Sequence, residues 1–206
     1  MSLESIVPAF IILIASLSFH EAAHAWAADR LGDPTARRLG RLTLNPLAHI
    51  DWIGTVLFPL VAMLSNLPLI GWAKPVPVDM RNLRAPRRDF ALVALAGPVS
   101  NIVLAVGFAL VLKAQGGLVP DGGQTVITGA LALAVFLNVL LAVFNLLPIP
   151  PLDGGNVLAG IVPESVAQLI DRMRPYGFLL LYAMVLLGVL DLFVWPIQRF
   201  LGSWLL

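Results

Sequence analysis

Residues 6–28 read IVPAFIILIASLSFHEAAHAWAA, an apolar run with three ionisable side chains near its end. A run of about 20 apolar residues is long enough to cross the hydrocarbon core of a bilayer as a helix. Ionisable side chains at that depth are costly, and they usually face a cavity or a partner. The run therefore predicts a membrane-spanning helix that carries a functional site.

The composition of the chain agrees with this prediction. Of the 206 residues, 59% are hydrophobic and only 12% are charged, and the mean hydropathy is +0.90. Soluble domains carry about 25% charged residues, so we expect an integral membrane protein surrounded by a lipid bilayer. The formal net charge is only +1, and the basic residues lie beside apolar segments, so nothing indicates nucleic-acid binding. Because the chain has no cysteine, any metal ligands must be nitrogen or oxygen atoms.

The ionisable residues form the motif His20-Glu21-Ala22-Ala23-His24. Histidines four positions apart project from the same face of a helix and can hold one zinc ion, and the glutamate beside the first can act on a metal-bound water. The HExxH pattern alone also occurs by chance on surface helices. Its place inside an apolar run makes a hydrolytic metal site the better interpretation.

A catalytic zinc ion normally takes three protein ligands, and several residues could complete the pair. Asp29 and Asp33 are close in sequence, but they lie at an expected helix end, where turn roles are typical. His49, which follows an Asn-Pro turn, is a rival. Asp153 is the strongest candidate, because three prolines interrupt the apolar segment before it in FNLLPIPPLDGG, residues 144–155. Irregular backbone at membrane depth persists only where protein or a wet cavity satisfies it. A helix N-cap just outside the bilayer is the alternative role for this aspartate.

Apolar segments long enough to span a bilayer lie at 6–28, 90–113, 125–147 and 178–195. A fifth segment, 52–70, contains two prolines and leads into GWAKPVPV, residues 71–78, whose prolines favour an extended strand. We expect 52–70 to be re-entrant, because basic clusters flank it on both sides and the positive-inside rule assigns both flanks to the cytoplasm. These clusters are Arg30, Arg37, Arg38 and Arg41 before it, and Arg81, Arg84, Arg87 and Arg88 after it. The histidine motif and Asp153 then face the cytoplasmic side of a multi-pass protein of the cell membrane.

Shorter features complete the predicted fold. Residues 36–50 alternate in polarity, which favours a short β-hairpin, and residues 160–175 have the spacing of an amphipathic surface helix. The predicted class is an all-α polytopic membrane protein with about four to six transmembrane helices, a small membrane-associated β element and a re-entrant segment. We expect residues 1–206 to form a single integral-membrane domain.

Polar and aromatic residues inside the apolar segments have structural interpretations. Asn101 and Asn138 are expected to hydrogen-bond between helices, with Gly97 allowing a close approach. Tryptophan often anchors a protein at the headgroup level. This role is expected for Trp52, Trp72, Trp195 and Trp204.

Three motifs together resemble the site-2 protease family of intramembrane zinc metalloproteases. They are HEAAH at 20–24, AGPVSN at 96–101 and NLLPIPPLDGG at 145–155. The resemblance covers about residues 15–158, and it is to a short form, because neither a PDZ nor a CBS domain fits in the loops.

The resemblance implies roles for individual residues. It implies that His20, His24 and Asp153 bind one zinc ion per chain. It implies that Glu21 is the catalytic acid/base and that Asn145 holds the substrate or the developing oxyanion. It also implies a membrane-associated β element that pairs with an unwound strand of the substrate. The residues of this element are Gly71, Trp72, Ala73, Lys74, Pro75 and Val76, continuing to Val78, and an inert loop is the alternative role for this segment.

These observations predict an intramembrane zinc endopeptidase that hydrolyses peptide bonds within or near transmembrane segments of membrane-protein substrates. One alternative is a zinc-binding membrane protein without proteolytic activity, such as a metal transporter. Another is a scaffold that binds transmembrane helices. A transporter would not need the general base Glu21, and an inactive scaffold need not keep it. The sequence gives no indication of the oligomeric state.

Overall fold

The computed structural model describes residues 3–65, 72–117 and 125–206, and no strand occurs among them. The helices are α1 (Leu3–Leu31), α2 (Thr35–Arg38), α3 (Phe58–Ser65), α4 (Pro86–Ala114), α5 (Val126–Asn145), α6 (Asp153–Ile161), α7 (Glu164–Met173), α8 (Gly177–Leu186) and α9 (Val189–Leu205). Tighter or wider helical turns occur at η1 (Pro46–Ala48), η2 (Trp52–Leu57), η3 (Met80–Asn82) and η4 (Arg174–Tyr176).

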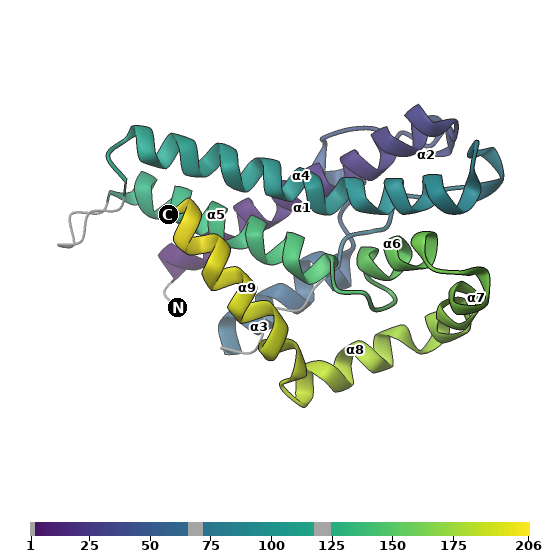
Figure 1. Cartoon of the computed structure of the whole chain (residues 1–206). Helices are drawn as coiled ribbons and strands as arrows, with labels where there is room; N and C mark the ends of the chain where they lie inside the picture. Colours follow the sequence, from purple (N-terminus) through teal and green to yellow (C-terminus); the bar gives the residue numbers. More distant parts are fainter. Residues whose placement is uncertain (1–2, 66–71, 118–124) are drawn as a thin grey trace.

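In the described part of the chain, α1, α4 and α5 are the helices long and apolar enough to cross a membrane. They correspond to the predicted spans 6–28, 90–113 and 125–147, which are thus confirmed as helices. In Figure 1, α4 and α5 run side by side and α1 crosses behind them. Because α4 packs against α1, α5 and α6, it is the central helix of the bundle. Helix α7 lies within the predicted amphipathic helix 160–175.

The fourth predicted span, 178–195, is wrong as a single helix. Helix α8 ends at Leu186 and α9 begins at Val189, because Gly188 between them adopts a left-handed φ of 66°. Glycine adopts this conformation at little cost and often ends a helix. The sequence stays apolar on both sides of Gly188, so hydropathy alone could not predict the break between α8 and α9. The described residues thus contain three candidate spans rather than four to six.

The predicted β element is not found among the described residues. Residues 36–50 were expected to form a hairpin, but they contain α2, turns and η1. Asn45 starts η1 by accepting a hydrogen bond from the Leu47 amide, a local bond that competes with strand pairing. Residues 72–79 form no strand. The Trp72 amide donates to the Gly54 carbonyl and the Lys74 amide to the His49 carbonyl, and these isolated bonds do not make a ladder with one neighbouring strand.

The predicted re-entrant segment, 52–70, is described only in part. Residues 52–65 form η2 followed by α3, an apolar helical piece too short to be a candidate span. Residues 66–71, where the chain would turn back, lie outside the described residues. The prediction of a re-entrant segment therefore stays a prediction.

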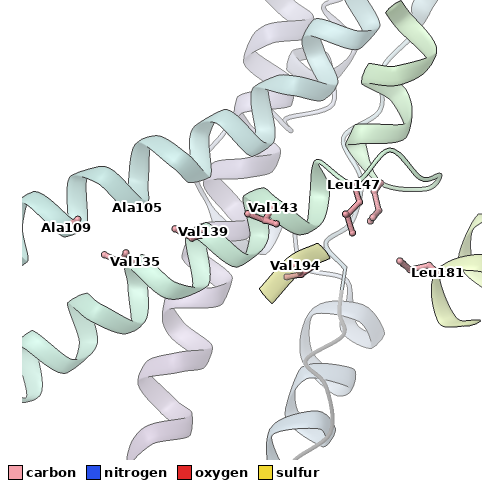
Figure 2. Close-up of a cluster of buried hydrophobic side chains, with 9 residues drawn as sticks. Ala105, Ala109, Val135, Val139, Val143, Leu147, Leu181 and Val194 are labelled. Atoms are coloured by element: carbon pink, nitrogen blue, oxygen red, sulfur yellow. The ribbon is translucent and has the colours of Figure 1, made fainter. Parts of the chain in front are cut away.

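Helices α4, α5 and α9 meet in a core of small and β-branched side chains. Figure 2 shows Ala105 and Ala109 of α4 near Val135 and Val139 of α5, with Val194 of α9 and Leu181 of α8 further along. All six side chains are buried. In a bilayer, small residues allow helices to approach closely, so that van der Waals contact holds them together. This core fixes the position of α5, whose end leads into the loop before α6.

The carboxylate of Asp33 connects the end of α1 to the chain before α4. It is 0% exposed, and it accepts hydrogen bonds from the Asp79 amide at 2.7 Å and from Asn82 Nδ2 at 2.9 Å, as well as from Thr35. Burial raises the pKa of Asp33, but these hydrogen bonds outweigh it and hold its pKa below the usual value. Asp29 forms an ion pair with Arg37. Both aspartates thus have structural partners at the helix end.

Candidate metal centre

His20, His24 and Asp153 come together although they belong to two distant segments. The Nε2 atom of His20 lies 3.0 Å from Oδ2 of Asp153, and Nε2 of His24 lies 3.4 Å from the same oxygen. One ligand atom from each residue lies within 4.8 Å of the others, so the group could hold a metal ion. The two histidines are only 4% and 8% exposed. The structure therefore assembles the predicted ligand set in a buried position.

Hydrogen bonds at the opposite edges of the two rings orient the histidines. Nδ1 of His20 lies 2.6 Å from Oδ1 of Asn101, and Nδ1 of His24 lies 2.7 Å from the backbone carbonyl of Val93. Both oxygens are acceptors, so each Nδ1 carries a proton, and in the neutral ring that binds a metal each Nε2 presents a lone pair. Two Nε2 lone pairs then face a carboxylate oxygen. A shared cation suits that arrangement, and metal-binding histidines usually donate their other N–H to an oxygen in this way.

Gly97 provides the space for the imidazole rings. A Cβ atom at this position would lie 2.4 Å from Nε2 of His24 and 2.5 Å from Nε2 of His20. The sequence predicted that Gly97 allows a close helix approach. In the structure, the close approach involves the two rings. Val93, Gly97 and Asn101 are spaced four residues apart in α4, so one face of this helix contacts both histidines.

The chemistry of these donors fits zinc. Two imidazole nitrogens and one carboxylate oxygen form a common ligand set of catalytic zinc sites, which keep a fourth position for water or substrate. The separations between the donor atoms are small enough for one ion to reach all three. The residues present thus satisfy the requirements of the metal that the sequence indicated.

The loop between α5 and α6 positions Asp153 next to the histidines. Asp153 lies in the first turn of α6, where the helix dipole favours a negative charge. A Cβ atom at Gly154 would lie 2.3 Å from the carbonyl oxygens of Leu146 and Leu147, and one at Gly155 would lie 2.8 Å from the Pro150 nitrogen. The two glycines therefore let the proline-rich loop fold directly against the start of α6.

Glu21 lies beside the group and is 8% exposed. Its Oε2 accepts a hydrogen bond of 3.0 Å from the backbone amide of Val76. Sequence reasoning missed this contact, because its donor is a backbone amide 55 positions away, which no residue type marks. The amide fixes one carboxylate oxygen of Glu21 next to the candidate ligands.

A cavity of about 380 Å³ opens beside these residues. His20, Glu21, His24 and Asp153 line it, and so does Asn145, whose Nδ2 donates to the Leu141 carbonyl at 2.9 Å. Most of the remaining wall is apolar, including Phe90, Phe144, Leu152 and Leu181. The predicted catalytic residues thus share one cavity with the candidate metal ligands.

The predicted substrate-binding segment forms one wall of this cavity. Trp72, Ala73, Pro75 and Val76 line it, whereas Lys74 is not among the lining residues and is exposed. Gly71 lies outside the described residues. The Trp72 ring was expected to anchor the protein at the membrane surface. It packs against Phe58 and Phe178, with ring centroids 5.4 and 5.9 Å away, and the anchoring role stays a prediction.

His49 does not join the candidate metal group. Its Nε2 donates to the Thr43 carbonyl at 2.8 Å, and its own carbonyl accepts the Lys74 amide at 2.9 Å. Among the described residues, the group of His, Asp and Glu side chains able to hold one ion is formed by His20, His24 and Asp153. The structure thus gives His49 a role in holding the segment that follows η2 and α3.

Comparison with known proteins finds a family model and relatives that are named zinc metalloproteases. A family model described as peptidase family M50 matches residues 121–188. The "Putative zinc metalloprotease YwhC" of Bacillus subtilis is 39% identical over 196 residues, an alignment that covers 93% of this chain and 86% of that protein. The "Putative zinc metalloprotease Rip2" of Mycolicibacterium smegmatis is 32% identical over 91% of this chain and 71% of its own length.

A more distant relative is "Zinc metalloprotease MJ0392" of Methanocaldococcus jannaschii, which is 25% identical over 89% of this chain and 43% of that protein. No solved structure matches the chain. The extent of the match to the Bacillus protein agrees with the resemblance to site-2 proteases drawn from the three motifs. The chain therefore belongs to peptidase family M50 and is a metallopeptidase.

Proposed function

We propose that this metallopeptidase is an intramembrane zinc endopeptidase, which hydrolyses peptide bonds within or near transmembrane segments of other membrane proteins. The observation that carries the proposal is the place of the histidines inside α1, a helix long and apolar enough to cross a membrane. At a rise of 1.5 Å per residue, His24 and His20 lie about 10 and about 16 Å from the end of α1 at Leu31. A buried hydrolytic site at this depth serves substrates that are themselves in the bilayer.

His20, His24 and Asp153 hold one zinc ion per chain in this proposal. A bound zinc ion would act as a Lewis acid, which lowers the pKa of water and polarises a carbonyl group. Glu21 takes a proton from the attacking water and passes it to the leaving amine, while the Val76 amide holds its Oε2 in place. Asn145, in the same cavity, provides an amide that can hydrogen-bond to the substrate carbonyl and to the negative charge that develops on it.

Residues 72–78 bind the substrate backbone as an added strand in this proposal. Trp72 and Lys74 direct their backbone groups into the protein, where the amides donate to carbonyls and the carbonyls accept from Thr55 and Arg41. The Val76 amide also points inward, to Glu21. In an extended chain, alternate residues face the opposite edge. That edge belongs to Ala73, Pro75 and Pro77, where the prolines offer carbonyls but no N–H.

This edge therefore takes N–H donors from the substrate. We expect N-methylation at alternate substrate residues to slow cleavage when the methylated amides are those that would donate to this edge. Each lost hydrogen bond should lower kcat/KM by about 2- to 12-fold, from a net 0.5–1.5 kcal/mol per bond. N-methylation of the intervening residues is the matched control. Equal effects in both registers would contradict strand addition at this edge.

We also propose that the site faces the cytoplasmic side of a multi-pass cell-membrane protein. The end of α1 and the start of α4 lie together, since a Cβ atom at Gly32 would meet the Asn82 carbonyl at 2.9 Å. The chain around this end contains most of the basic residues, and cytoplasmic loops carry such an excess. The basic residues near this end are Arg30, Arg37, Arg38, Arg41, Arg81, Arg84, Arg87 and Arg88.

Removal of one candidate ligand tests the proposed function directly. In purified protein, Asp153→Ala should weaken zinc binding by more than about a hundredfold and abolish cleavage of a transmembrane peptide, because loss of even an outer partner costs 10–100-fold. Asp171→Ala is the control, since Asp171 is exposed and pairs with Arg174. Zinc content is measured by elemental analysis and cleavage by mass spectrometry. Full zinc occupancy and cleavage in Asp153→Ala would refute the proposed ligand set.

A further inference from the structure

Ser16, Asn101 and Asn138 form a polar group buried where α1, α4 and α5 meet. They are 2%, 0% and 0% exposed. Nδ2 of Asn138 donates to the Ala134 carbonyl and to Ser16 Oγ, both at 2.9 Å. Nδ2 of Asn101 donates to Oδ1 of Asn138 at 3.0 Å and to the Ser16 carbonyl at 3.3 Å. The remaining oxygen of Asn101 lies 2.6 Å from Nδ1 of His20.

The two backbone carbonyls fix the direction of every hydrogen bond in this group. A carbonyl only accepts, so the amide nitrogen of Asn138 must face Ala134, and its oxygen must face Asn101. The Ser16 carbonyl likewise requires the amide nitrogen of Asn101, which leaves its oxygen for His20. Neither amide can be reversed without placing two acceptors against each other. The network therefore specifies a proton on Nδ1 of His20, so that in the neutral ring Nε2 is the nitrogen free to bind a metal.

The two histidines differ in what orients them. His24 donates to the backbone carbonyl of Val93, which the helix itself holds in place. His20 depends on a side chain, and that side chain depends on residues of two other helices. Asn101 was predicted to be a link between helices, and it does contact both α1 and α5. Its shortest hydrogen bond, however, is to a candidate metal ligand.

We propose that Asn101, held by Asn138 and Ser16, is the positioning residue for His20, and that this network sets the affinity of the site for zinc. The inference rests on the proposed zinc site and adds residues of α4 and α5 that never touch the metal. Its consequence is that a change in Asn138, a residue of α5, weakens zinc binding through Asn101 and His20. The effect requires no change in the ligands themselves.

The test compares zinc dissociation constants of the full chain in detergent, measured by competition with a chelator. We expect Asn101→Leu to weaken binding by about 10- to 100-fold, as loss of a partner that orients a ligand does elsewhere, and Asn138→Leu to weaken it less. Gln198→Leu is the matched control. Gln198 is also a buried amide, 4% exposed, and it donates to the Phe136 carbonyl at 3.1 Å without contacting the candidate site.

A spectroscopic measurement separates positioning from general destabilisation. Cobalt(II) bound in place of zinc reports ligand geometry through its visible absorption. We expect Asn101→Leu to change this spectrum and Gln198→Leu to leave it as in the wild type. If Asn101→Leu does not fold, Asn138→Leu and Ser16→Ala supply the same comparison.

The outcomes distinguish the inference from the proposed function. Wild-type protein that fails to bind zinc contradicts the proposed function. Wild-type protein that binds zinc, together with network variants that bind within threefold of it and give the same cobalt spectrum, overturns the inference alone. Equal losses in Asn101→Leu and Gln198→Leu also overturn it, because the network would then contribute only to stability.

Discussion

Glu21→Gln protein is expected to bind zinc as tightly as the wild type and to cleave a transmembrane substrate about 10²–10⁴-fold more slowly, the usual contribution of a positioned acid/base. A glutamine oxygen can still accept the hydrogen bond that the Val76 amide donates to Oε2. The side chain therefore keeps its place, but an amide cannot take a proton from water. Initial cleavage rates and zinc content of the same preparation measure the two effects separately.

Glu164→Gln is the matched control for this change. Glu164 lies in α7 and pairs with Arg87 at 2.7 Å on the surface, where such pairs contribute little. This variant should cleave at the wild-type rate. Cleavage by Glu21→Gln at a similar rate would remove Glu21 from the mechanism, and loss of its zinc would show that Glu21 acts on the metal site itself.

Gly97→Ala is expected to abolish zinc binding and cleavage while leaving the helices intact. The added methyl group would lie 2.4 and 2.5 Å from the Nε2 atoms of His24 and His20, so both rings must leave their ligand positions. Because the carbonyl of Val93 and the amide of Asn101 hold the opposite ring edges, the rings cannot move without losing those bonds. We expect zinc affinity to fall by more than about a hundredfold, beyond the cost of losing one orienting partner.

The same helix provides a matched control for this substitution. A Cβ atom at Gly107 would meet nothing within 4 Å, so Gly107→Ala should bind zinc normally and gain slightly in helix stability, by up to about 1 kcal/mol. Circular dichroism tests whether both variants keep their helices, and chelator competition measures their zinc affinities. Normal zinc binding by Gly97→Ala would mean that the rings have a different arrangement in solution.

Hydropathy was sufficient to predict the long helices, because a bilayer requires every span to be long and apolar. It could not predict the break at Gly188, since an apolar run has the same hydropathy whether or not a helix ends inside it. The hairpin predicted at 36–50 was wrong for a related reason. Alternating polarity is a weak signal over a few residues, and the Asn45-Pro46 turn was the stronger one.

The candidate ligands could be selected from the sequence because zinc chemistry restricts residue types and spacing so strongly. The partners that orient them could not. The contacts of His24 with the Val93 carbonyl and of Glu21 with the Val76 amide use backbone groups, which no particular residue type marks. Asn101 was singled out, but its contact with His20 depends on how α4 is rotated against α1. The spacing of Val93, Gly97 and Asn101 by four residues, together with the AGPVSN motif at 96–101, was the available signal for that face.

His20 and Asp153 are 133 positions apart in the chain, which affects when the proposed enzyme can become active during synthesis. Helices of membrane proteins insert individually and associate afterwards. A nascent chain that has inserted only α1 has both imidazoles and Glu21 but lacks Asp153, so its proposed ligand set is incomplete. Synthesis from the N-terminus therefore completes the proposed ligand set only once α6 has been made.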